Sequence, residues 1–119
     1  MELKRSHVLY DVWVEDTRLL ETVDLWQTLL LSAARDAGAT VLKAHFQQFT
    51  PIGITGFLLL AESHISVHTW PEEGLATIDI FTCGAMDTAS IIHRIHQCLD
   101  PCEETLTTID RGQGSKGAE

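Results

Sequence analysis

The chain has 119 residues, 45% of them hydrophobic and 21% charged, which is the size and composition of a single globular domain. Its formal net charge of −9 argues against binding to nucleic-acid phosphates and is compatible with a cationic substrate. No apolar run is long enough to span a membrane, and residues 1–7 lack the apolar segment of a signal peptide. We therefore predict one cytoplasmic domain over residues 1–119 that binds neither membranes nor nucleic acid.

The sequence predicts six strands and two helices. The strand segments are rich in β-branched and aromatic residues, and the helical segments repeat apolar residues at helical spacing. Asp16 is the expected N-cap of the first helix and Gly38 its stop, whereas Pro71 and Pro101 end the elements before them. In chain order, the predicted elements are strand 7–14, helix 16–37, strand 40–49, strand 56–61, strand 64–68, strand 75–82, helix 87–99 and strand 103–109.

This order of elements favours one fold class. Strands outnumber helices and short turns join most of them, which is typical of an α+β domain with a mostly antiparallel sheet and both helices on one face. Trp26 lies on the apolar stripe of the first helix and is expected in the core. The other face of the sheet needs a partner if it is apolar, so we predict a homodimer that stacks sheet on sheet. The polar, glycine-rich residues 111–119 are predicted to be disordered.

Candidate chemical groups gather in residues 61–72, directly after an apolar run. If this stretch is extended, His64, Ser66 and His68 share one face of a strand. The row has three possible interpretations: the solvent side of a half-buried strand, a zinc site completed by Cys83, or a set of proton-transfer groups. Residue spacing leaves all three open, although no spacing typical of a zinc motif is present.

The cysteines do not predict a disulfide framework. Cys83, Cys98 and Cys102 are an odd number of thiols without metal-site spacing, which indicates reduced cysteines. Burial in the core is the ordinary role of such a cysteine.

An ordered set of short motifs narrows these possibilities. Together they resemble the signature of the small prokaryotic S-adenosylmethionine decarboxylase proenzymes, over roughly residues 7 to 111. The motifs are Gly38-Ala39-Thr40-Val41, Phe49-Thr50-Pro51-Ile52-Gly53-Ile54-Thr55-Gly56, Glu62-Ser63-His64, His68-Thr69-Trp70-Pro71-Glu72, Asp79 and Phe81-Thr82-Cys83-Gly84.

The resemblance implies a pyruvoyl cofactor made from the chain itself. Decarboxylation at an amino-acid α-carbon needs an electron sink, which pyridoxal phosphate commonly supplies through a lysine. The three lysines, Lys4, Lys43 and Lys116, are in unpromising places, and no glycine-rich phosphate-binding motif is present. In the family, the serine that corresponds to Ser63 attacks the carbonyl of Glu62. The expected products are a beta chain, 1–62, and an alpha chain, 63–119, that begins with the pyruvoyl group.

The resemblance also implies roles for other residues. His68 matches the histidine that removes the α-proton of Ser63 during processing, and imidazole titrates near neutral pH. Thr55 stands where the family usually has serine, and its hydroxyl is expected to hydrogen-bond the processing intermediate. Cys83 matches the thiol that protonates the product carbon after carbon dioxide leaves.

Substrate recognition is predicted from three positions. Glu72 matches the carboxylate that accepts hydrogen bonds from the ribose hydroxyls. Phe49 and Trp70 are aromatic side chains suited to stacking on adenine or facing a sulfonium cation. Trp70 fits a core position equally well. The implied assembly is an α-β-β-α sandwich of two chains with sites at their interface.

Departures from the family pattern leave the substrate open. Leu75 and Gln47 replace an aromatic residue and a histidine, no glycine precedes His7, and Glu73 adds a carboxylate. The first hypothesis is an S-adenosylmethionine decarboxylase that supplies the aminopropyl donor for spermidine. The second is a pyruvoyl decarboxylase of a basic amino acid, ornithine or arginine, and the third is a non-catalytic dimeric binding module.

Overall fold

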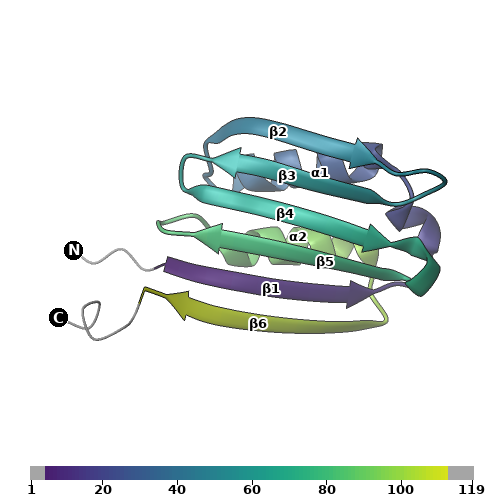
Figure 1. Ribbon diagram of the computed structural model, residues 1–119. Helices are drawn as coiled ribbons and strands as arrows, with labels where there is room; N and C mark the ends of the chain where they lie inside the picture. The colour runs from purple at the N-terminus through teal and green to yellow at the C-terminus, as the bar shows by residue number, and fades with distance from the viewer. Residues whose placement is uncertain (1–4, 113–119) are drawn as a thin grey trace.

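The computed structural model describes residues 5–112 as an antiparallel sheet with two α-helices and two 3-10 helices (Figure 1). This arrangement confirms the predicted α+β fold. The elements are β1 (Arg5–Trp13), η1 (Thr17–Leu20), α1 (Val23–Asp36), β2 (Val41–Gln48), β3 (Ile54–Leu60), β4 (Ser63–Trp70), η2 (Pro71–Glu73), β5 (Leu75–Thr82), α2 (Thr88–Leu99) and β6 (Glu103–Arg111).

The six strands lie in the order β2-β3-β4-β5-β1-β6, and each neighbouring pair is antiparallel. Strands β2 to β5 form a meander joined by short turns, which local sequence signals predict well. The first strand of the chain then pairs with β5 on one side and with the last strand on the other. The sheet therefore places both ends of the described chain on the far side of β5, which is the neighbour of the strand that carries Ser63 and His68.

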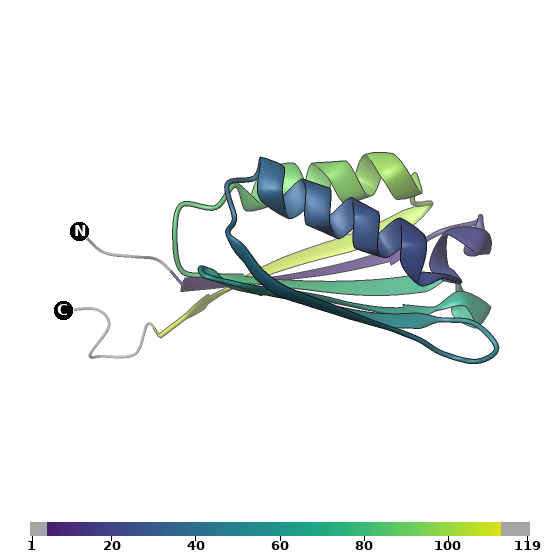
Figure 2. The same ribbon diagram turned by 90° about the horizontal axis from the view of Figure 1, so that it is seen from above.

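Both α-helices cover the same face of the sheet (Figure 2). Alternate side chains of β1, β3, β4 and β5 point into this layer, as expected for strands with one buried face. Tyr10, Trp26, Leu58, Ile80 and Ile95 are fully buried there. Each such side chain contributes about 1.5–3 kcal/mol through removal of apolar surface from water. The expected core position of Trp26 is confirmed.

No helix of the described residues covers the other face of the sheet (Figure 2). Polar residues alternate with apolar ones on this open face, and Phe57, Leu59 and Ile109 are 40%, 41% and 43% exposed. These three side chains come from β3 and from the edge strand β6, with β4, β5 and β1 between them. The open face is thus mixed in character, with apolar side chains available for contact with a partner.

The prediction of one helix from residue 16 to residue 37 is wrong. The structure has the short η1, a break at Glu21 and Thr22, and then α1. Asp16 does cap η1, because its carboxylate accepts a hydrogen bond from the backbone N–H of Arg18. The carbonyl of Leu20 accepts instead from the Thr69 hydroxyl, at 2.8 Å, and that of Glu21 from the Gly53 N–H, at 3.2 Å. Residues of β4 and of the β2–β3 loop therefore bond to the carbonyls that a continuous helix would use.

Other element boundaries differ by a few residues. Strand β3 begins at Ile54 rather than at residue 56, and the signature strand β4 covers Ser63–Trp70 rather than 64–68 alone. Arg111 is the last residue of β6, so the predicted disordered tail begins too early, and residues 113–119 lie outside the described part. No helix among the described residues is long and apolar enough to cross a membrane.

A polar network ties the edge strand β6 to its neighbours. The hydroxyl of Tyr10 donates to Glu104 Oε1 at 2.6 Å, and His96 Nδ1 lies 2.9 Å from Glu104 Oε2. Burial, together with the Glu104 carboxylate, raises the pKa of Tyr10, whereas the Tyr10 hydroxyl lowers the pKa of Glu104. Strand β1, helix α2 and strand β6 are joined at this point, at some distance along the sheet from Ser63.

Candidate active site

The predicted cleavage point lies at the start of a strand, after a tight turn. Ala61 and Glu62 form the two-residue connection between β3 and β4, and Leu60 pairs with Ser63 across it. Two-residue hairpins normally use residues with positive φ in the turn itself. Here neither turn residue has positive φ, and Ser63 has a φ of 150° instead. A non-glycine residue in such a sparsely populated region costs about 1–3 kcal/mol, so the backbone is strained at Ser63.

The carbonyl of Glu62 receives two hydrogen bonds from the segment that follows β5. Both the backbone N–H and the thiol of Cys83 lie 3.2 Å from this oxygen. Cys83 directly follows β5, which pairs with β4 in a register that sets Ser63 opposite Thr82. Two donors aimed at one carbonyl oxygen can stabilise negative charge that develops on it during nucleophilic attack.

The predicted processing residues Thr55 and His68 are also in contact. They face each other across β3 and β4, and Thr55 Oγ1 lies 3.0 Å from His68 Nδ1. The threonine hydroxyl thus holds the imidazole in a fixed orientation, which the usual serine would also do. The other ring nitrogen, Nε2, is then available to exchange a proton with a second group.

One chain does not bring His68 to Ser63. The two residues are five positions apart on the same extended strand, which corresponds to about 16 Å at the usual rise per residue. An imidazole that removes a proton must come within hydrogen-bond reach of it. Ser63 and Cys83 therefore form one group of predicted residues, and Thr55 on β3 and His68 on β4 form another toward the opposite end of these strands.

The predicted substrate-binding residues lie beyond the second group. Trp70 ends β4, Glu72 belongs to η2, and Phe49 begins the loop between β2 and β3 (Figure 1, the end of the sheet opposite the β3–β4 turn). Phe49 and Trp70 are 47% and 37% exposed, so the alternative of a core position for Trp70 is wrong. The Trp70 ring also lies near His68, with centroids 6.1 Å apart.

Sequence reasoning missed a cluster at the Ser63 end of β4, where His64 directly follows Ser63 and pairs with Phe81. His7, on β1, stands beside Phe81, and His64 on β4 stands on the other side of the same ring, with centroids 5.7 and 5.8 Å away. His7 Nε2 is 3.3 Å from Asp79 Oδ1, although the angle is unsuitable for a hydrogen bond. Burial lowers the pKa of His64, with a further contribution from His7. His7 joins this cluster only through the long-range pairing of β1 with β5, which no local sequence pattern predicts.

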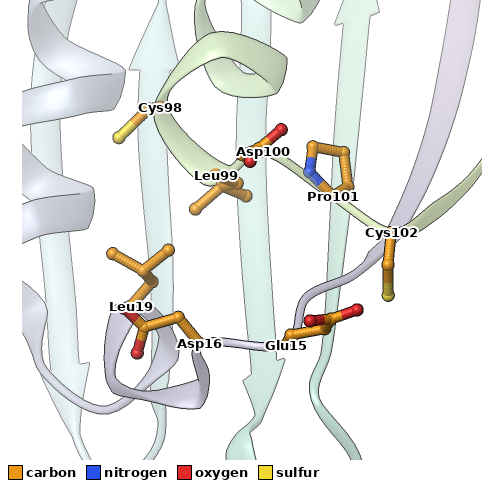
Figure 3. A pocket seen from close by; sticks show the side chains of 8 residues that line it. All are labelled: Glu15, Asp16, Leu19, Cys98, Leu99, Asp100, Pro101 and Cys102. Carbon is orange, nitrogen blue, oxygen red and sulfur yellow. The ribbon is translucent and has the colours of Figure 1, made fainter.

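A metal site or a pocket at the predicted residues would also point to an active site. Within residues 5–112 no group of three or more His, Cys, Asp or Glu side chains is arranged to hold a metal ion. A pocket of about 590 Å³ lies between the end of α2 and the segment around Asp16 (Figure 3). Its lining includes Glu15, Cys98 and Cys102 but none of the residues predicted for catalysis.

Sequence comparison identifies the family. The sequence model described as S-adenosylmethionine decarboxylase matches residues 6–112, and the chain belongs to this family. An S-adenosylmethionine decarboxylase proenzyme of Sulfurihydrogenibium sp. (strain YO3AOP1) is 46% identical over 107 residues, which are 89% of this chain and 80% of the relative. The proenzyme of Pseudomonas paraeruginosa (strain DSM 24068 / PA7) is 40% identical over 100 residues, 83% of this chain and 62% of the relative.

The fold agrees with the sequence match. The crystal structure of the adenosylmethionine decarboxylase from Aquifex aeolicus superimposes with a TM-score of 0.84 at 37% identity, covering 94% of this chain and 93% of that one. The chain spans about 54–62% of the length of the Pseudomonas and Aquifex proenzymes that it matches.

Proposed function

We propose that this chain is the proenzyme of a pyruvoyl-dependent S-adenosylmethionine decarboxylase, which supplies the aminopropyl donor for spermidine synthesis. The observation that carries the proposal is the peptide bond before Ser63. Its carbonyl accepts hydrogen bonds from the N–H and the thiol of Cys83, and the residue after it is strained. A hydroxyl, a polarised carbonyl and a strained backbone are the requirements for attack of a serine on its own peptide bond.

The proposed self-cleavage balances without an external oxidant. Ser63 Oγ attacks the Glu62 carbonyl carbon, the C–N bond breaks and an ester forms, with its nitrogen now a free amine. Loss of the Ser63 α-proton then expels the Glu62 carboxylate. Water replaces the nitrogen, which leaves as ammonia, and residue 63 becomes a pyruvoyl group at the start of chain 63–119. The residues around Ser63 fit this origin of the cofactor.

His68 and Thr55 are assigned to the partner chain in a homodimer. The separation of about 16 Å along β4 excludes direct proton transfer from Ser63 to His68 of the same chain. Two sheets that stack through their open faces in antiparallel orientation bring the His68 region of one chain over the Ser63 region of the other. Each dimer then has two sites, and each site needs both chains.

Cys83 has a second role after cleavage. Once formed, the pyruvoyl group supplies the carbonyl that acts as the electron sink for decarboxylation. The Cys83 thiol lies beside residue 63 through its contact with the Glu62 carbonyl oxygen, so it is positioned to donate a proton at the product carbon.

Substrate recognition is assigned to Glu72, Phe49 and Trp70. The exposed aromatic rings are suited to adenine or to the sulfonium cation, and the Glu72 carboxylate is suited to the ribose hydroxyls. Like His68, these side chains lie at the end of the sheet opposite Ser63 and serve the partner's site. Family membership favours S-adenosylmethionine over ornithine or arginine and over a binding module, and release of labelled carbon dioxide from the three substrates tests this preference.

An intact mass spectrum of the purified wild-type protein tests the proposal. We expect two fragments, 1–62 and 63–119, with the second lighter than a peptide that starts with serine and blocked to N-terminal sequencing. A single mass of the whole chain, under conditions in which the protein is folded, contradicts self-cleavage. The cytoplasmic location stays a prediction of the sequence.

A further inference from the structure

We propose that the Glu62 side chain is a positioning group for self-cleavage, because it fastens the turn that carries the reactive peptide bond to the start of β2. The inference depends on the cleavage proposed above and adds a role for a carboxylate that does not itself react. Glu62 otherwise enters the chemistry only through its backbone carbonyl.

Two hydrogen bonds tie the β3–β4 turn to one residue on its outer side. Glu62 Oε1 accepts from the backbone N–H of Thr40 at 3.0 Å, and the N–H of Ala61 donates to the carbonyl of Thr40 at 2.9 Å. Thr40 immediately precedes β2, the edge strand on this side of the sheet. This hydrogen bond from the Thr40 N–H is also the main reason that the pKa of Glu62 is lowered.

The same turn is held from the opposite side by Cys83. Its N–H and thiol contact the Glu62 carbonyl oxygen, while Thr40 contacts the side chain of the same residue. Hydrogen bonds therefore hold Glu62 from both sides. The residue with the unusual φ, Ser63, comes directly after it. Strained conformations persist only where the surrounding contacts enforce them.

Removal of the side-chain contact leaves a single hydrogen bond, from the Ala61 N–H to the Thr40 carbonyl, to hold the turn on the Thr40 side. The backbone can then rotate so that Ser63 adopts an ordinary strand φ, which moves its hydroxyl relative to the Glu62 carbonyl. A misplacement of about 1 Å in a reacting pair can cost about 100-fold in rate. The contact needs an oxygen acceptor of the right reach rather than a negative charge, so an amide at the same position preserves it.

The test compares Glu62→Gln, Glu62→Met and Glu62→Ala in the full chain. Newly synthesised protein is sampled over time, and the first-order rate of splitting is read from intact masses. Glu62→Gln should split within about threefold of the wild-type rate, whereas the methionine and alanine variants should be at least about tenfold slower. Glu103→Ala is the matched control, because this exposed glutamate begins β6 and the substitution should leave the rate unchanged.

Thermal unfolding in a Ser63→Ala background separates positioning from folding. There the three Glu62 variants should keep a Tm close to that of Ser63→Ala alone, so that slow splitting is not explained by an unfolded chain. A normal rate for both methionine and alanine overturns the inference, and so does a glutamine variant as slow as alanine. Wild-type protein that never splits overturns the proposed function as well, whereas split wild type with unaffected variants overturns the positioning role alone.

Discussion

The two ends of strand β4 differ in how they hold their functional groups. At the Ser63 end, a strained peptide bond is fixed by hydrogen bonds from neighbouring turns, and the reactive atoms belong to the backbone and two short side chains. Toward the Trp70 end, the His68 imidazole accepts or donates one hydrogen bond with the Thr55 hydroxyl, and the exposed Trp70 ring lies near it. The proposed function assigns bond cleavage to the first region, and proton transfer and ligand binding to the second. In the proposed dimer each site combines the first region of one chain with the second region of its partner.

Ser63→Ala should abolish the chemistry of the first region entirely. Without the hydroxyl there is no nucleophile, so the variant should remain one chain of full mass and release no carbon dioxide from S-adenosylmethionine. The substitution removes one small, half-buried polar group, so the fold should persist. Intact mass and circular dichroism check both statements, and a Ser63→Ala protein that splits and turns over substrate rules out the proposed cofactor.

Mixing two inactive variants tests whether the regions act between chains. His68→Ala alone should stall splitting, and Ser63→Ala alone cannot split. In a dimer of one chain of each kind, one site combines Ser63 with the partner's intact His68, whereas the other site lacks both. Random pairing of equal amounts therefore restores about one in four sites, and only the His68→Ala chain is cut.

Co-expression with two different affinity tags, followed by mass spectrometry, identifies which chain is cut. Each variant expressed alone serves as the control. If the His68→Ala chain stays uncut in purified mixed dimers, His68 does not act on the partner's Ser63, and the arrangement of half-sites proposed here is wrong.

The sequence predicted which residues form the two regions of β4, but not the distances and contacts between them. The alternation in β4 predicted that His64, Ser66 and His68 share a face, and the burial of Ile65 and Val67 on the other face confirms it. The motif order pointed to the residues on which the proposed site is built. The distance between Ser63 and His68 was not predicted, because the predicted strand began at residue 64 whereas β4 begins at Ser63.

Long-range pairing accounts for most of what the sequence did not predict. The insertion of β1 between β5 and β6 brings His7 beside Asp79, and no local pattern encodes it. The break before α1 arises in the same way, since the carbonyls of Leu20 and Glu21 bond to Thr69 and Gly53, which are distant in sequence. The positive φ of Ser63 could not be predicted from the sequence either. It occurs beside Glu62, which is bonded to Thr40 and Cys83, two residues that are distant from it in the sequence.

Cys83→Ala should weaken the first region without eliminating it. The backbone N–H still donates to the Glu62 carbonyl, but the thiol contact is lost. Loss of one donor to a developing oxyanion typically costs about 100-fold or more in catalysis, and the weaker thiol donor should cost about 10- to 100-fold in splitting rate. The processed fraction should also protonate product poorly, which shows as low turnover or altered products in a carbon dioxide assay. Splitting at the wild-type rate would mean that the thiol does not assist cleavage.

Thr55→Val and Thr55→Ser should affect the second region more mildly. Valine keeps the shape of threonine but cannot hold His68 Nδ1, so splitting should slow by about tenfold. Serine keeps the hydroxyl, and its rate should stay within about threefold of the wild type. Time courses of intact mass distinguish the two, and equal rates for valine and threonine would show that the hydroxyl does not orient the imidazole.

Tyr10→Phe should alter stability while leaving both regions of β4 unaffected. The variant loses the hydrogen bond to Glu104, which is worth about 1 kcal/mol because that carboxylate is partly exposed. Since the bond lowers the pKa of Glu104, its contribution is fully present above the ordinary value of 4.5 and is lost as the pH falls through the lowered value. Urea unfolding of Ser63→Ala protein with and without Tyr10→Phe should therefore show a difference at pH 7 that shrinks in acid. A constant difference across this range would show that the effect of the hydroxyl does not depend on the charge of Glu104. Slower splitting of Tyr10→Phe in the chain that keeps Ser63 would show that the two ends of β4 depend on the network that joins β1, α2 and β6.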